Sequence, residues 1–190
     1  MLFKFEDIEV PVLSVGSSDS ANSAFCINAE SYEFEKVFPT IEKGKDYHFV
    51  SAGSWSNIAL LEFLLNFTGK SFLYITSWSI SDYAIKRLIA LKEKNMITGA
   101  KCIFDKRTDT FNPNILDFAQ SNIDVQLTSI HAKNMVIIGE HFNLCVVQSS
   151  NLNENKRIES GVISTHDNTV SFHKNWINIL HESLKNGAVR

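Results

Sequence analysis

The alternation of strand-like and helix-like segments from about residue 46 constrains the fold of this chain most strongly. Short apolar runs rich in β-branched and aromatic residues predict strands, and longer segments with leucines at helical spacing predict helices. Repeated βα units of this kind favour parallel strands with helices on the faces of the sheet. The strands are predicted at residues 47–50, 72–75, 101–104 and 123–127, and the helices at about 55–67, after Ser79, and at 113–120.

Glycine and capping residues suggest where the first two helices begin or end. Gly69 follows the first helix, in a position that is typical of a helix end. Ser79 and Asp82 have the spacing of a capping box for the second helix, and Gly99 is interpreted as its terminal glycine. These positions set the expected limits of both helices.

The pattern changes after residue 127 to consecutive strands and one long helix. A hairpin is expected around Glu140 and His141, and the last helix has apolar residues at intervals of four that would pack on a sheet. The expected class is therefore α/β, with a mixed β-sheet sandwiched between helices. The strands are predicted at residues 132–139, 142–148 and 160–165, and the helix at about 169–186.

The first 45 residues differ in texture from the rest. Residues 17–23 are rich in serine and typical of turns, and residues 8–13 resemble a short strand. We interpret residues 1–45 as an N-terminal extension of short strands and loops, and residues 46–190 as the main domain. The extension would cover a sheet edge, help a dimer form, or gate a cleft.

Composition excludes few classes of function. The longest apolar run, residues 58–65, contains Glu62 and is too short to cross a bilayer, and the start lacks the layout of a signal peptide. A cytoplasmic protein without integral membrane contact is expected. The formal charge of −3 gives no overall attraction to nucleic acid, although a local basic cleft would still bind phosphate. The three cysteines are widely spaced, form no metal-ligand cluster and are interpreted as small buried side chains.

Two pairs of polar residues, each spaced by two, carry the chemistry. His131 and Lys133 share one face if they lie on a strand, and so do Ser149 and Asn151 at the end of the next strand. If the strands pair, an imidazole, an ammonium, a hydroxyl and an amide converge. This set suits a phosphate group, with one nucleophile or base, one cation and two neutral donors. Glu159 follows in the next strand and would orient His131 through its second ring nitrogen.

The order His131-x-Lys133, Ser149-x-Asn151 and Glu159 resembles the signature of the phospholipase D-like superfamily. The resemblance covers about residues 46–186 and is strongest to short, single-signature members of phage and bacterial type. It implies a metal-independent phosphodiesterase without cofactors. One histidine attacks phosphorus and forms a phosphohistidine, and a second protonates the leaving oxygen and then activates water.

A chain with one signature supplies only one of these histidines. The resemblance therefore implies a homodimer in which His131 of each subunit faces the other, with Lys133 and Asn151 holding phosphate oxygens. Ser149 would donate a supporting hydrogen bond, and Glu159 would orient the partner histidine. The sequence departs from the family at Ile138, where an aspartate is usual five residues after the lysine.

Residues outside the signature have competing interpretations. Asp105, Lys106 and Arg107 follow a strand end, which makes Arg107 a candidate for binding substrate phosphate, although a solvated turn is the more ordinary interpretation. Trp55 and Trp78 would line a pocket and stack on a base, but core packing is the more frequent role of such residues. The remaining five histidines show no metal-ligand spacing.

Three functions compete at this point. The first is a nuclease or other phosphodiesterase that acts on DNA or RNA. The second is a catalytically weak or inactive module that binds nucleic acid or phosphate in the same cleft, which Ile138 favours. The third is a lipid phosphodiesterase, for which the chain lacks a basic amphipathic helix.

Overall fold

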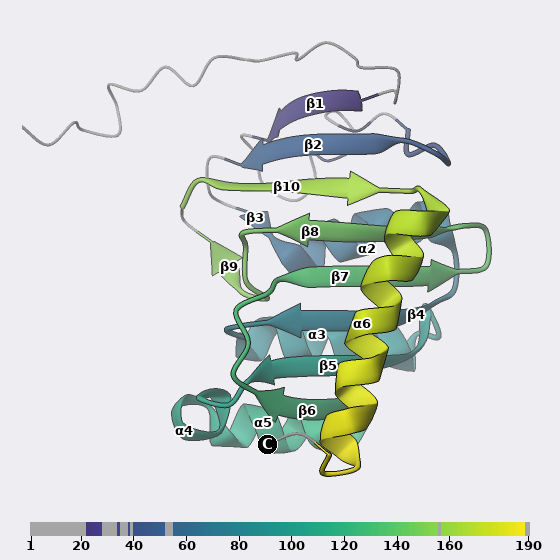
Figure 1. Cartoon of the computed structure of the whole chain (residues 1–190). Coiled ribbons are helices and arrows are strands. Elements are labelled where there is room, and N and C mark those ends of the chain that lie inside the picture. The colour runs from purple at the N-terminus through teal and green to yellow at the C-terminus, as the bar shows by residue number, and fades with distance from the viewer. Residues whose placement is uncertain are drawn as a thin grey trace, which may run out of the picture.

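The computed structural model describes residues 22–27, 34, 38, 40–51, 55–155 and 157–188 of the chain. An eight-stranded mixed sheet crosses the molecule in the order β1-β2-β10-β8-β7-β4-β5-β6, and β3 pairs with β9 in a small separate sheet (Figure 1). The α/β class and the mixed sheet are therefore confirmed. The strands are β1 (Asn22–Ile27), β2 (Asp46–Ser51), β3 (Trp55–Ser56), β4 (Ser71–Ser77), β5 (Ile97–Asp105), β6 (Asp124–Thr128), β7 (Asn134–Gly139), β8 (Asn143–Gln148), β9 (Glu154–Asn155) and β10 (Glu159–Ser164).

Helices lie against both faces of the sheet (Figure 1). The last helix packs on one face, where Val170 and Ile177 meet Ile103, Val136 and Cys145 of the strands. The other helices lie on the opposite face, over a larger core that holds most of the buried leucines. The helices are α2 (Asn57–Thr68), α3 (Asp82–Glu93), α4 (Thr108–Phe111), α5 (Pro113–Asn122) and α6 (Asp167–Lys185).

Strand direction decides which loops meet. β4 pairs with β5 in parallel and β5 with β6 in parallel, whereas β7 runs antiparallel to both β4 and β8. β10 runs antiparallel to β8 and β2. The carboxyl ends of β4, β5 and β8 therefore lie beside the amino ends of β7 and β10. These strand ends form one end of the sheet, on the left in Figure 1.

Two predicted helix limits are wrong. The side chain of Ser81, not Ser79, caps α3 and accepts a hydrogen bond from the backbone N–H of Ala84 at 3.2 Å. The helix ends at Glu93, and Gly99 lies inside β5. Asn95, with φ 59°, adopts the left-handed conformation that the sequence analysis assigned to a glycine. An asparagine can take this conformation at modest cost, so the chain turns four residues earlier than predicted.

Part of the predicted N-terminal extension joins the sheet. β1 pairs in parallel with β2 and forms the edge of the sheet, from Asn22 opposite Asp46 to Ile27 opposite Ser51. Phe34 and Phe38 are buried and pack against Phe63 with ring centroids 5.5 and 5.9 Å apart. The strand predicted at residues 8–13 lies outside the described residues.

Cysteine burial follows the prediction where the structure describes it. Cys102 and Cys145 are free and buried. Burial raises the pKa of the Cys145 thiol to about 12. Both thiols are therefore packed as small apolar groups. No helix among the described residues is long and apolar enough to span a membrane.

Gly139 provides a test of the hairpin that joins β7 and β8. A Cβ atom at Gly139 would lie 2.3 Å from the carbonyl oxygen of Thr68 and 2.9 Å from that of Phe142, and backbone cannot move aside easily. We expect Gly139→Ala to lower the free energy of unfolding by about 1–3 kcal/mol. Gly99→Ala is the control, because its nearest atom belongs to the Phe72 side chain at 3.1 Å. Equal denaturation midpoints for the two variants would contradict the packing described for the hairpin.

Candidate active site

His131 and Lys133 lie in the loop between β6 and β7. The sequence analysis placed them on a strand, but β7 begins only at Asn134. The spacing nevertheless brings the side chains together, because Nζ of Lys133 lies 2.9 Å from Nδ1 and 3.0 Å from Nε2 of His131. A position equally far from both ring nitrogens is off the axis of the one in-plane lone pair that a neutral imidazole offers. The imidazole therefore contacts the ammonium group without a hydrogen bond directed at one ring nitrogen.

The two side chains differ in exposure. His131 is exposed, whereas Lys133 is 8% exposed and its carbonyl accepts the backbone N–H of Gln148 at 3.1 Å. Burial lowers the pKa of Lys133, and the negative charge of Glu159 opposes that shift only in part. The site thus has a cation on a fixed backbone beneath an accessible imidazole.

Ser149 and Glu159 form a second contact at the same end of the sheet. The Ser149 hydroxyl donates to Oε2 of Glu159 and also accepts the backbone N–H of Ser160 at 3.1 Å. The backbone N–H of Ser149 donates to the carbonyl of Ser160 at 2.9 Å. Among the described residues, Glu159 makes this bond to Ser149 and none to His131. The carboxylate acts on Lys133 through its charge.

Asn151 lies in the loop that follows β8, and hydrogen bonds connect this loop to α2 and β4 at the same end of the sheet. The side-chain amide of Asn57, at the start of α2, donates to the carbonyls of Ser150 and Asn151 at 2.9 and 2.6 Å. The backbone N–H of Leu152 donates to the hydroxyl of Ser77, at the end of β4, at 2.9 Å. The loops after β4 and β8 are therefore held against each other.

Arg107 is fixed beside the histidine by Asp105 and Trp78. Its Nε–H and backbone N–H donate to Oδ1 of Asp105 at 2.6 and 3.0 Å. Its guanidinium lies 4.7 Å from the centre of the Trp78 ring, and that ring lies 5.9 Å from the ring of His131. The backbone N–H of Ile130 donates to Oδ2 of Asp105 at 3.3 Å, so one carboxylate anchors both Arg107 and the loop that carries His131.

Sequence reasoning favoured another role for two members of this arrangement and missed a third. Asp105 is 3% exposed, although the segment around it was interpreted as a solvated turn. Trp78 is 37% exposed, although core packing was the favoured interpretation. Asn57 was missed, because its bonds reach a loop 93 residues further along the chain and no local pattern indicates them.

Asp105 gives the site a testable dependence on pH. Burial alone would raise its pKa, but the hydrogen bonds from Arg107 and Ile130 and the charge of Arg107 lower it overall. A lowered pKa stabilises the folded state above the pKa of the unfolded chain, about 3.9, and this stabilisation is lost as the pH falls through the folded value.

We expect Asp105→Asn to lower the free energy of unfolding by about 1–2 kcal/mol at pH 7, since a charge-assisted acceptor is replaced by a neutral amide. Urea titrations at pH 7 and below pH 3 would measure this. The difference from the wild type should shrink at the lower pH. A difference that persists unchanged there would show that shape, not charge, matters at this position.

Ile138 lies far from the candidate site. It pairs with Phe72 and Asn143 near the hairpin end of β7, and it packs with the cluster beneath α6. Five residues of extended chain separate it from Lys133 by about 17 Å. The residue at this position therefore cannot touch a phosphate held by His131 and Lys133.

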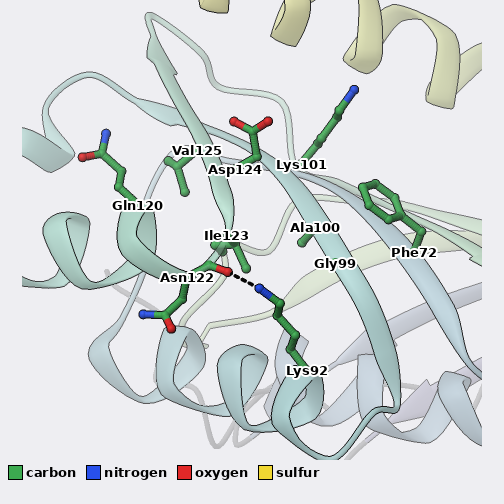
Figure 2. Close-up of a pocket in the computed structure, with 10 residues that line it drawn as sticks. All are labelled: Phe72, Lys92, Gly99, Ala100, Lys101, Gln120, Asn122, Ile123, Asp124 and Val125. Atoms are coloured by element: carbon green, nitrogen blue, oxygen red, sulfur yellow. Dashed lines mark hydrogen bonds between the residues drawn. The ribbon is translucent and has the colours of Figure 1, made fainter.

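A hollow of about 700 Å³ opens at the other end of the sheet (Figure 2). It lies between the ends of α3 and α5 and the starts of β5 and β6, and Lys92 at its rim donates to the carbonyl of Asn122 at 2.6 Å. It contains none of the six predicted site residues. Volume alone therefore does not identify the reactive region of this molecule.

Comparison with known proteins supports the fold. No family model matches the chain, and no curated protein matches it. Polyphosphate kinase from Porphyromonas gingivalis is similar to 73% of this chain with a TM-score of 0.56 and 15% identity. The archaeal chromatin protein TrmBL2, described with a novel mode of DNA binding, is similar to 80% of it with a TM-score of 0.51 and 12% identity.

These likenesses are ones of fold. The chain spans 24% of the length of the polyphosphate kinase chain and 57% of that of the chromatin protein. At 15% and 12% identity, the likenesses concern the arrangement of helices and strands alone.

Proposed function

We propose that this protein is a metal-independent phosphodiesterase, acting on nucleic acid, of the phospholipase D-like type. The observation that carries the proposal is the contact between His131 and Lys133, at the end of the sheet where Ser149 also bonds to Glu159. A nucleophile beside a buried cation suits a phosphodiester, because the cation neutralises the charge that develops on the phosphate oxygens. TrmBL2, as a DNA-binding protein of similar fold, is compatible with a nucleic-acid substrate.

The reaction would proceed in two displacements. A ring nitrogen of His131 attacks phosphorus, and the P–O bond to the leaving group breaks as a second histidine gives that oxygen a proton. The second histidine then takes a proton from water, and the hydroxide releases the phosphate from His131. Lys133, Arg107 and Asn151 would hold the non-bridging oxygens. Ser149 would connect this set to Glu159.

The second histidine would come from another copy of the chain. Each subunit has one His131, and apolar side chains surround the site on the sheet. Val50, Val147 and Ile158 are 37%, 38% and 45% exposed. Ile158 precedes Glu159, Val147 lies two residues before Ser149, and Val50 precedes Ser51, which pairs with Glu159. A second subunit packed on this region about a two-fold axis would place its own His131 on the same side of the molecule.

The alternative function is a module that binds nucleic acid or phosphate without turnover. The absence of the family's aspartate at Ile138 favoured it from the sequence. The packing of Ile138 beneath α6 weakens this argument, because a side chain there would not reach a phosphate at His131 and Lys133.

Mixing two versions of the protein tests the proposal. Turnover of single- and double-stranded DNA and of a generic phosphodiester is first measured in excess EDTA, and the wild type is then re-equilibrated with His131→Ala. If both histidines serve one site, total activity falls with the square of the wild-type fraction, to about a quarter in an equal mixture. A linear fall would contradict the shared site. No turnover by the folded wild type would favour the binding module.

A further inference from the structure

Trp78 is a large aromatic side chain left accessible at the candidate site. It directly follows β4, is 37% exposed and lies beside His131, with the two rings tilted by 58°. An exposed indole next to a nucleophile is unexpected for a side chain that serves only the core. Its position beside His131 therefore suits contact with a substrate bound at the candidate site.

Arg107 lies over the face of this indole and extends the surface. Its guanidinium is 4.7 Å from the ring centre, and the salt bridge to Asp105 holds it there. The side chain is still 53% exposed. Within the part of the chain that the structure describes, its terminal Nη atoms have no hydrogen-bond partner. Trp78 and Arg107 thus form a preorganised pair with unused donors.

Such a pair matches the chemistry of an unpaired nucleotide. Nucleobases stack on aromatic rings and on guanidinium planes whatever their sequence, and free Nη donors suit the phosphate next to the base. A base inside a duplex cannot use the surface, because both of its faces are already stacked on neighbours. A lipid phosphodiester has no planar group to place there.

We propose that Trp78 and Arg107 form a stacking platform for an unpaired nucleobase next to the phosphate held by His131 and Lys133. The inference rests on the proposed phosphate site and makes it selective for single-stranded nucleic acid. The base lies on the outer face of the guanidinium, with the indole as its support. Trp78 is then a specificity-determining residue.

Binding to His131→Ala tests the platform without cleavage. The probes are a fluorescent single-stranded DNA oligonucleotide, an RNA of the same sequence, the matching duplex, and an abasic chain with the same number of phosphates. Both single strands should bind about 10-fold or more tightly than the abasic chain. Adding Trp78→Ala should remove most of that advantage and weaken binding of the abasic chain much less.

Two further variants separate stacking from charge and from general damage. Arg107→Lys keeps the charge but loses the plane, so it should weaken single strands more than the abasic chain. Phe118→Ala removes an exposed aromatic side chain from α5 and should change neither affinity.

The outcomes separate the two proposals. Equal binding of the single-stranded and abasic chains would overturn the platform and leave the phosphate site intact. Binding of neither chain, with no turnover by the wild type, would overturn both.

Discussion

Replacing His131 with alanine is expected to reduce turnover of a phosphodiester in excess EDTA by about 10³-fold or more, because the reaction loses the group that attacks phosphorus and its acid–base partner. The side chain is exposed, so the melting temperature should change little. The measurement is kcat/KM for the variant and the wild type, with circular dichroism melts of both.

His141→Ala is the matched control for this experiment. His141 is also exposed, but it lies in the β7–β8 hairpin at the other end of the sheet. It should retain the activity of the wild type. Loss of activity in both variants, or in neither, would contradict the assignment of His131 as the reacting histidine.

Replacing Lys133 with methionine is expected to lower kcat/KM by about 10²-fold, because the phosphate loses a fixed cation. Burial lowers the pKa of this lysine, so it loses its proton at a lower pH than an exposed lysine does. The alkaline fall in activity should therefore include a part due to Lys133, beside the part due to the histidine that acts as acid, and the Lys133 part should come earlier than it would with an ordinary ammonium. The measurement is the pH profile of kcat/KM.

Lys133→Arg tests whether the loss of the Lys133 proton contributes to the alkaline fall in activity. A guanidinium keeps its proton at every pH at which the protein is folded, so the part of the alkaline fall due to Lys133 should disappear, and the part due to the acid histidine should remain. Lys94→Met, which changes an exposed lysine at the end of α3, should behave like the wild type. A Lys133→Arg profile with the same alkaline fall as the wild type would assign the whole titration to other groups.

Local patterns in the sequence predicted much of the fold. Apolar periodicity gave α2, α5 and α6 and the main strands within a few residues, because burial of one face imposes the same period in sequence and structure. The capping error at α3 arose because Ser79 and Ser81 are equally suitable residues two positions apart. Only the path of the chain after β4 selects between them.

The site was predictable in content but not in its contacts. The pairing of His131 with Lys133 depends on two neighbouring residues, so spacing alone brought them together. The bond between Ser149 and Glu159 depends on the register between β8 and β10, which no local pattern encodes. The exposure of Trp78 depends on the absence of a covering element, and that is a property of the whole fold.

The separation of the two ends of the sheet has a consequence for altering the protein. The predicted site residues come from loops at one end, whereas the turns from α2 to β4, from α3 to β5 and from α5 to β6 lie at the other. A change in the length of those turns alters neither the loops that carry the site nor their hydrogen bonds. An inserted peptide, a fluorophore or a surface anchor is thus best placed in the turn from α3 to β5, where Lys94 and Asn95 are exposed and the approach of a long polymer to His131 stays unobstructed.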